Sequence, residues 1–222
     1  MASSQAKQPL SLKKKPLLPS NEHAIIKGLY YYPNFLTQEE GQILMKEVES
    51  SQDWHGVTSN PKSRRVIQYG YIYSYTGEPL RQATPIPATY SHIIKKLEEV
   101  PLLKEEKSSF DQLLINEYLS GQGIAAHTDN IKQFGPIIAC ITLGSGVEIE
   151  FTKDGVTQYI YVQPNSLYIM SGDARYVWKH EIRKRKSDEV NVLNIPRKKR
   201  ISLTLRSVWK DHQIGKSWGN PP

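Results

Sequence analysis

The chain has 222 residues, with 29 basic and 22 acidic side chains, a net charge of +7 and a single cysteine. This length can bury a real core, and the basic excess favours a polyanionic partner, meaning nucleic acid, over a membrane, although solvated surface lysines would give the same count. Cys140 excludes an intrachain disulfide, no apolar run approaches a membrane span, and the N-terminus lacks a secretory core, so we expect a reduced, intracellular protein, cytoplasmic or nuclear.

The N-terminal half begins with a tail and continues with helical patterns. Residues 1–20 are polar, lysine-rich and interrupted by prolines, which predicts a disordered basic tail. One folded domain is expected over residues 21–210, followed by a C-terminal tail over 211–222. Thr37 and Glu40 form a capping box before an apolar face, which predicts a helix over 37–50. A second helix is expected over 90–99, ended by Pro101.

Strand patterns follow on both sides of that second helix. Residues 64–75 place tyrosines at alternate positions from 69 to 75, which predicts an aromatic strand. From position 112 onward short strands separated by turn residues are expected at 112–118, 137–143, 147–151, 158–162, 166–170 and 201–208. The charged segment 183–199 lacks periodicity and is expected to be an exposed loop. The pattern predicts a mainly β (α+β) sandwich, jelly roll or barrel.

Two histidines and one aspartate are candidate metal ligands. His127 and Asp129 lie two positions apart on an extended segment, so both side chains point to the same side and can face one ion. His180, within YVWKHEI, would complete the two-histidine, one-carboxylate set of non-haem iron(II) enzymes, which leaves positions open for a cosubstrate and oxygen. Taken alone, the first pair would be a surface turn and His180 a structural histidine.

A candidate anion site follows from the alternation in residues 200–206. A strand there would place four polar side chains on one face: Arg200, Ser202, Thr204 and Arg206. Two buried arginines each need an anion, and a dicarboxylate supplies one at each end to their bidentate forks. Asn116 and Tyr118 share a face of another strand and could donate hydrogen bonds to the same acid. The alternative is an outward basic edge strand.

In chain order, Asn116-x-Tyr118, His127-x-Asp129, His180 and Arg200-x-Ser-x-Thr-x-Arg206 resemble the AlkB family of nucleic-acid oxygenases over about residues 28–209. The resemblance implies a double-stranded β-helix (jelly roll) core with flanking N-terminal helices and a nucleotide-recognition lid. It also implies an Fe(II)- and 2-oxoglutarate-dependent dioxygenase that consumes O2. The segments NEYLSGQGIAAHTD, ITLGSGVEIEF and SGDARYVWKHEI look most like the branch that hydroxylates modified wobble uridines in tRNA.

The resemblance also implies a role for each matching residue. His127, Asp129 and His180 would bind iron. The 2-oxoglutarate would be held by Arg200 at its distal carboxylate and Arg206 near its keto-acid end, assisted by Asn116, Tyr118 and Ser202, where some repair members have Asn in place of the serine. The lid over the target nucleotide would contain Arg64, Arg65, Tyr69 and Tyr71.

The implied substrate is a nucleic-acid base, in a single-stranded RNA, a tRNA loop or alkylated DNA. We expect the protein to be a monomer. Either oxidative demethylation of an alkylated base or hydroxylation of a modified tRNA uridine fits. Repair members carry an acidic residue shortly after the His-x-Asp pair, whereas this chain has Asn130-Ile-Lys132, which weighs against methylated adenine or cytosine. Two rivals stay open: a protein hydroxylase or demethylase on the same fold, and a binding module with an idle iron site.

Overall fold

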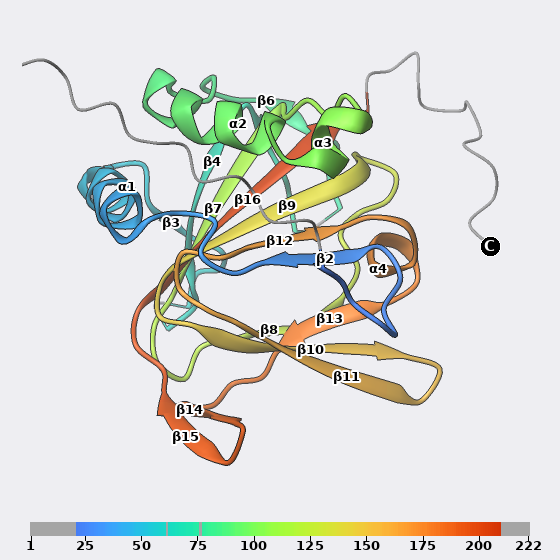
Figure 1. Cartoon of the computed structure of the whole chain (residues 1–222). Helices are drawn as coiled ribbons and strands as arrows, with labels where there is room; N and C mark the ends of the chain where they lie inside the picture. The colour runs from blue at the N-terminus through green and yellow to red at the C-terminus, as the bar shows by residue number, and fades with distance from the viewer. Residues whose placement is uncertain (1–20, 61, 76, 210–222) are drawn as a thin grey trace, which may run out of the picture.

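The computed structural model describes residues 21–60, 62–75 and 77–209. Two antiparallel sheets pack on each other, and the helices α1, α2 and α3 cover the outer face of the larger sheet (Figure 1). This mainly β architecture confirms the predicted jelly-roll core with flanking helices. The tails expected at 1–20 and 211–222 lie outside the described residues.

The larger sheet has eight strands. In spatial order they are β1 (Asn21–Glu22), β2 (Leu29–Tyr32), β12 (Leu167–Met170), β9 (Phe134–Gly144), β16 (Arg200–Val208), β7 (Gln112–Tyr118), β4 (Arg65–Tyr69) and β3 (His55–Gly56). The long strands β7, β9 and β16 lie side by side in the middle. Their inner faces therefore form a continuous floor for a site.

The smaller sheet has four strands, in the order β11 (Val156–Val162), β10 (Val147–Lys153), β13 (Lys179–Ile182) and β8 (Ile124–His127). Two short hairpins stand apart from both sheets: β5 (Tyr71–Ile72) with β6 (Arg81–Gln82), and β14 (Ser187–Val190) with β15 (Leu193–Pro196). The helices are α1 (Gln38–Ser50), α2 (Ser91–Glu98), α3 (Pro101–Glu105) and α4 (Gly172–Tyr176), with a 3-10 turn at Ala88–Tyr90. None of the helices in these described ranges is long and apolar enough to cross a membrane.

The large sheet separates two apolar cores. The first lies between this sheet and the helices, and the second lies between the two sheets. Strand β16 contributes to the first core with its odd-numbered aliphatic residues Ile201, Leu203 and Leu205. Because side chains alternate along a strand, its even-numbered polar residues face the space between the sheets, as the sequence predicted.

The two predicted helices are confirmed with small changes at their ends. The Thr37 hydroxyl accepts from the Glu40 amide at 3.1 Å, and the Glu40 carboxylate accepts from the Thr37 amide at 2.7 Å, so the capping box starts α1. Pro101 does follow α2, but it also begins α3, where its missing amide costs no helical hydrogen bond.

Two predictions were wrong. The aromatic strand over 64–75 breaks at Gly70, whose φ is +79° and whose added Cβ would lie 1.9 Å from the Asp111 carbonyl oxygen. The alternation of the tyrosines therefore does not continue past Gly70. The segment 183–199, expected to be a loop, contains the hairpin β14–β15, because Asp188 accepts from Arg197 and Arg185 and neutralises the charges at its base.

Candidate active site

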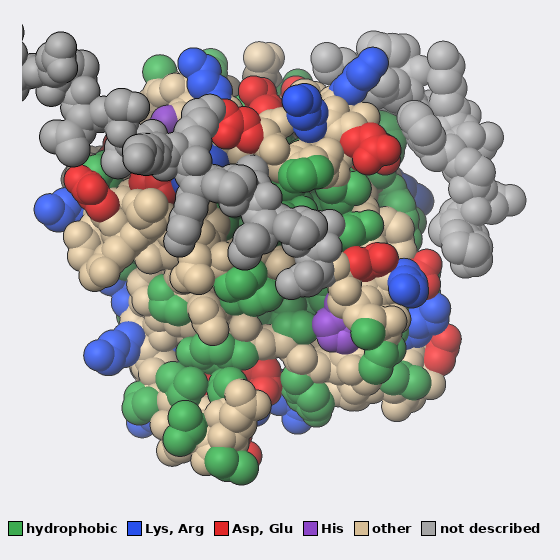
Figure 2. All heavy atoms as spheres, in the orientation of Figure 1, with side chains coloured by type: hydrophobic (Ala, Val, Ile, Leu, Met, Phe, Trp, Pro, Cys, Tyr) green, Lys and Arg blue, Asp and Glu red, His purple; other side chains and the backbone are tan. Residues whose placement is uncertain are grey.

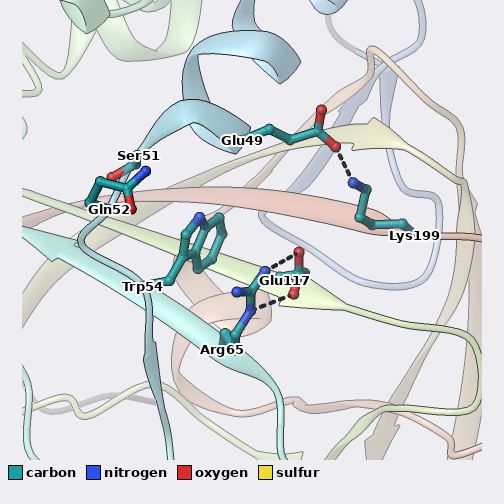
Figure 3. Close-up of a pocket in the computed structure, with 7 residues that line it drawn as sticks. All are labelled: Glu49, Ser51, Gln52, Trp54, Arg65, Glu117 and Lys199. Atoms are coloured by element: carbon teal, nitrogen blue, oxygen red, sulfur yellow. Dashed lines mark hydrogen bonds and ion pairs between the residues drawn. The ribbon is translucent and has the colours of Figure 1, made fainter.

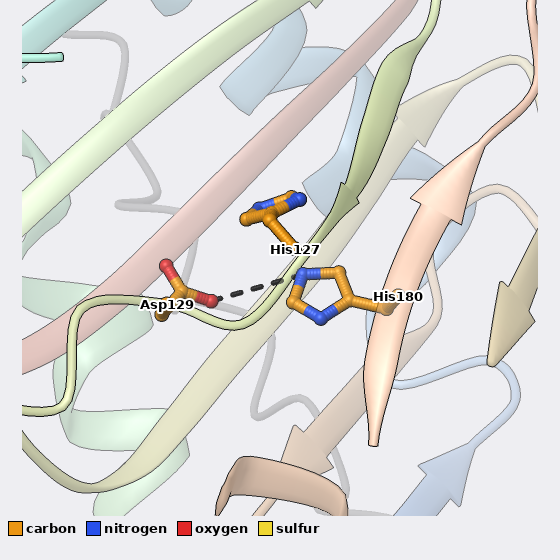
Figure 4. Close-up of side chains that lie close together, drawn as sticks. All are labelled: His127, Asp129 and His180. Carbon is orange, nitrogen blue, oxygen red and sulfur yellow. Dashed lines mark ion pairs between the residues drawn. The ribbon is translucent and has the colours of Figure 1, made fainter. Parts of the chain in front are cut away.

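The three candidate metal ligands meet at the open edge of the small sheet (Figure 4). His127 ends β8 and is the cross-strand partner of His180 on β13, so the strand register brings the two rings to a centroid distance of 4.4 Å. Asp129 follows two residues after His127, and its Oδ2 lies 3.7 Å from His180 Nε2. One ligand atom from each residue lies within 4.8 Å of the other two.

The protonation states suit a metal ion. His127 Nδ1 lies 2.8 Å from the Ala125 carbonyl oxygen, which can only accept, so Nδ1 carries the proton and Nε2 is left for a metal. Burial and the neighbouring His127 lower the pKa of His180 to about 4, against the opposing effect of Asp129, so its ring is neutral near pH 7. Burial alone would raise the pKa of Asp129, but Arg206 and the two histidines outweigh it and lower it to about 2. A neutral imidazole at His180, an available Nε2 at His127 and the carboxylate of Asp129 fit iron(II).

Arg175 on α4 holds the loop that carries Asp129, and the sequence reasoning missed it. Its side chain is 2% exposed, and its guanidinium donates to the backbone carbonyls of Asp129 (2.8 Å), Asn130, Phe134 and Gly135 (3.2 Å each). No carboxylate pairs with it among the described side chains. This arginine therefore holds the backbone on both sides of residues 131–133.

A cavity of about 410 Å³ opens beside the triad, between the two sheets. Arg200 and Arg206 line it and are 3% and 2% exposed. Arg200 donates to the hydroxyls of Thr142 (3.0 Å) and Ser202 (3.3 Å), while its Nε has no partner. Arg206 donates to Asp129 (2.6 Å) and Gln112 (2.8 Å), while its Nη2 has none. Buried donors without acceptors fit an acid ligand with two anionic ends.

The other expected contacts of that acid also line the cavity. Asn116 and Tyr118 on β7 are the cross-strand partners of Ser202 and Arg200 on β16, and all four face the same space. The Tyr118 ring lies 5.4 Å from the Arg200 guanidinium, which it packs in place. The structure therefore brings together every residue that the sequence assigned to the acid.

The expected lid residues divide between several surfaces. Arg64 lines the cavity, where it donates to Asn116 Oδ1 at 3.1 Å. Tyr69 packs in the core beneath the helices and donates to Asp53 at 2.9 Å. Tyr71 and Arg65 do not line the cavity.

Two tyrosines beyond Gly70 lie at the cavity mouth, where the sequence predicted Tyr69 and Tyr71. Tyr73 and Tyr75 line the mouth and meet edge to face at 5.1 Å. The Arg64 guanidinium lies 5.4 Å from the Tyr75 ring and 5.9 Å from Tyr118. Gly70, between the first and second tyrosines of the run, was the signal that could have located this change.

Arg65 instead lines a second pocket of about 500 Å³, outside the space between the sheets (Figure 3). It makes a bidentate pair with Glu117 at 2.8 and 2.9 Å and lies 5.0 Å from the Trp54 ring. Glu117 alternates with Asn116 and Tyr118 on β7, so it points to the opposite face. Lys199 in this pocket is paired with Glu49. The charges here are satisfied internally.

Comparison with known proteins gives consistent matches. The model of the 2OG-Fe(II) oxygenase superfamily matches residues 28–206. Acanthamoeba polyphaga mimivirus protein L905, described as uncharacterised, is 34% identical over 192 residues, 84% of this chain and 87% of its own. Mouse tRNA (carboxymethyluridine(34)-5-O)-methyltransferase ALKBH8 is 33% identical over 172 residues, 75% of this chain but 26% of its own, so this chain spans about a quarter of it. The solved structure of OsALKBH1 superposes with a TM-score of 0.65 at 14% identity, covering 85% of this chain and 99% of that one, and supports the fold alone.

Proposed function

This chain belongs to the AlkB family of the 2OG-Fe(II) oxygenase superfamily, and from this premise we propose that it oxidises a base in a single-stranded or loop segment of nucleic acid. We further propose that RNA is favoured over DNA and a uridine derivative over an alkylated adenine or cytosine. A monomer acting inside the cell, in the cytoplasm or nucleus, completes the proposal.

The chain is an Fe(II)- and 2-oxoglutarate-dependent dioxygenase. Bound iron and 2-oxoglutarate supply the oxidation of a C–H bond by O2, with release of succinate and carbon dioxide. In our assignment His127, Asp129 and His180 hold the iron, and Arg200 pairs with the distal carboxylate. Arg206 keeps Asp129 ionised and meets the other end of the acid.

The main support for a nucleic-acid substrate is the set of side chains at the mouth of the cavity. Tyr73, Tyr75 and Arg64 present two rings and a guanidinium beside the triad. Aromatic and guanidinium faces stack on unpaired bases, and enzymes that modify a base must take it out of the stack. A base stacked there would point its substituent toward the three metal ligands.

Asn130 favours a carbonyl-bearing base. Its Oδ1 already accepts from the amides of Lys132 (2.9 Å) and Gln133 (3.2 Å), so the group that this cavity-lining amide presents is its NH2, which has two N–H donors and uses one for the Tyr73 hydroxyl. A donor suits O2 or O4 of uracil, whereas the exocyclic amine of adenine needs an acceptor such as a carboxylate. The printed name of the mouse relative refers to carboxymethyluridine in tRNA, which points the same way.

The test is a competition between substrates. Equal amounts of tRNA bearing modified wobble uridines, N-methylated RNA and N-methylated single-stranded DNA are incubated with the protein, Fe(II) and 2-oxoglutarate. We expect mass spectrometry to find one added oxygen on a tRNA nucleoside. On an N-methyl group the hydroxylated product would instead collapse to formaldehyde and the free base, so formaldehyde release would indicate demethylation.

The control replaces Asn130 with aspartate. Asn130→Asp supplies a carboxylate that can accept from the exocyclic amine of adenine. The substrate preference of this variant should therefore shift from the uridine derivative toward methylated adenine. If no nucleic acid stimulates succinate formation and binding ignores salt, the proposal is wrong and a protein substrate on the same fold takes its place.

A further inference from the structure

The hairpin β14–β15 projects from the body of the protein with an apolar tip. Figure 1 shows it separate from both sheets, and Figure 2 shows hydrophobic side chains gathered over it. Val192 at the tip is fully exposed, and Leu193 is 65% exposed. Two adjacent apolar side chains at a projecting tip form a small apolar surface that a binding partner can cover.

The turn at the tip is strained as well as exposed. Asn191 and Val192 connect paired strands and have φ of +48° and +63°. This geometry is that of a type I′ turn, in which asparagine followed by glycine is usual. A β-branched residue with positive φ is rare and costly. Valine therefore stands at a position where glycine would remove the backbone strain.

The base of the hairpin is rigid. Asp188 is 1% exposed and accepts from Arg197 at 2.6 and 2.7 Å and from Arg185 at 2.9 Å. The backbone amide of Glu148 on β10 also donates to Asp188, at 3.3 Å, and so ties the hairpin to the small sheet. The tip is thus presented on a fixed support.

The segment 183–199 contains seven basic and two acidic residues, so it carries much of the net charge of +7. Its three arginines and Lys199 are paired with acidic side chains. Lys184, Lys186 and Lys198 are exposed and have no acidic partner within the described part of the chain. These lysines complement a polyanion rather than an apolar protein surface.

Both ends of the segment start at the wall of the active cavity. Ile182 and Arg200 line that cavity, five residues before β14 and four residues after β15. The neighbouring turn at Gly123 packs so closely on Ile182 that an added Cβ would lie 2.1 Å from its carbonyl oxygen. Because the hairpin leaves from and returns to the cavity wall, a strand whose base enters the cavity can extend toward it.

We propose that the hairpin β14–β15 is a second nucleic-acid contact, in which Val192 and Leu193 pack against bases that flank the target nucleotide and the three free lysines meet their phosphates. The inference rests on the proposed function, and it assigns a binding surface to the part of the nucleic-acid strand that lies outside the cavity. Apolar wedges between base steps, supported by cations on the backbone, are an established way of gripping a nucleic acid.

The test compares Val192→Gly with wild type by fluorescence polarisation, using a labelled single-stranded RNA of about 20 nucleotides. We expect affinity to fall about fivefold or more, the loss of one central apolar contact, while the melting temperature stays equal or rises because glycine accepts the turn. A trinucleotide, too short to reach the hairpin, should bind both proteins equally. Val156→Gly removes an exposed valine from the β10–β11 hairpin and should match wild type.

A second variant tests the lysines. Replacing Lys184, Lys186 and Lys198 with glutamine should reduce the slope of log affinity against log salt by about 2, from about 0.7 per lost contact. If wild type binds the long RNA and Val192→Gly binds it equally, the hairpin inference is overturned and the proposed function stands. If wild type binds no nucleic acid, the proposed function itself fails. A wild-type dimer that Val192→Gly turns into a monomer, with RNA affinity unchanged, would assign the tip to a second copy and also overturn the inference.

Discussion

Replacing Arg175 should separate the stability of the fold from the quality of the metal site. Its guanidinium makes four hydrogen bonds to backbone carbonyls from a position that is 2% exposed. Bonds to a charged donor are worth about 1.5–3 kcal/mol each, but they are not additive, so we expect Arg175→Met to cost about 3–5 kcal/mol. For a chain of this size that lowers the melting temperature by about 10 °C.

The more specific effect concerns Asp129. Its carbonyl is one of the four acceptors, and its carboxylate is the one acidic member of the triad, so loosening the loop should misplace the ligand. We expect Arg175→Met to weaken metal binding about 10- to 100-fold, the usual cost of losing a supporting contact behind a ligand. Arg175→Lys keeps the charge but makes fewer hydrogen bonds, so its metal affinity should lie between those of wild type and Arg175→Met.

The assay titrates Mn(II) into the protein below its unfolding temperature and reads the affinity by calorimetry, with circular dichroism to confirm folding. Lys199→Met is the control, because Lys199 and its partner Glu49 are both exposed, at 41% and 39%, and neither belongs to the triad. Exposed pairs contribute about 0–1 kcal/mol, so this control should change neither quantity measurably. A folded Arg175→Met protein that binds Mn(II) with wild-type affinity would refute the reasoning.

Three further changes test the site and the lid. His180→Ala should abolish succinate production and reduce Mn(II) affinity with little loss of fold, and near-normal turnover would remove His180 from the ligand set. Arg200→Ala should raise the concentration of 2-oxoglutarate needed for half-maximal turnover by about 100-fold or more, with partial recovery in Arg200→Lys, because the charge remains without the bidentate fork; an unchanged requirement would refute the assignment. Gly70→Ala should destabilise the protein by about 2 kcal/mol or more, whereas Gly77→Ala, with positive φ but no atom within 4 Å of the added Cβ, should cost about 1 kcal/mol. Equal losses in thermal melts would show that the contact with Asp111 is unimportant.

Local patterns predicted the parts of the site that lie on single strands. The two-residue spacing of His127 and Asp129 and the alternation from Arg200 to Arg206 each fix which side chains share a face, whatever the sheet around them. The capping box at Thr37 fixed the start of α1 in the same way. What these patterns could not give was the register that pairs His180 with His127, because it depends on strands far apart in the chain.

The errors have a different physical origin. The tyrosine alternation failed at Gly70, because one residue with positive φ ends the regular strand and redirects everything after it. The hairpin in 183–199 was hidden by its charge. Its three arginines are neutralised by Asp188 and by acids on distant strands, and no local pattern reports such pairing. Arg175 was missed because its partners are backbone carbonyls, which have no sequence signature.

The same face of the large sheet links the acid site to the mouth of the cavity. Arg206 donates to Gln112 at 2.8 Å, and Gln112 donates in turn to the Tyr71 carbonyl at 2.7 Å. The next glutamine, Gln68, holds Tyr73 at both its amide and its carbonyl, at 2.8 and 3.2 Å. Gln112 also donates to Gln68 at 3.4 Å, so two buried amides connect Arg206 of the acid site to Tyr73, where a base would stack. Displacing Tyr73 would break both of its bonds to Gln68, and Gln68 also accepts from Gln112, the side chain that holds Arg206.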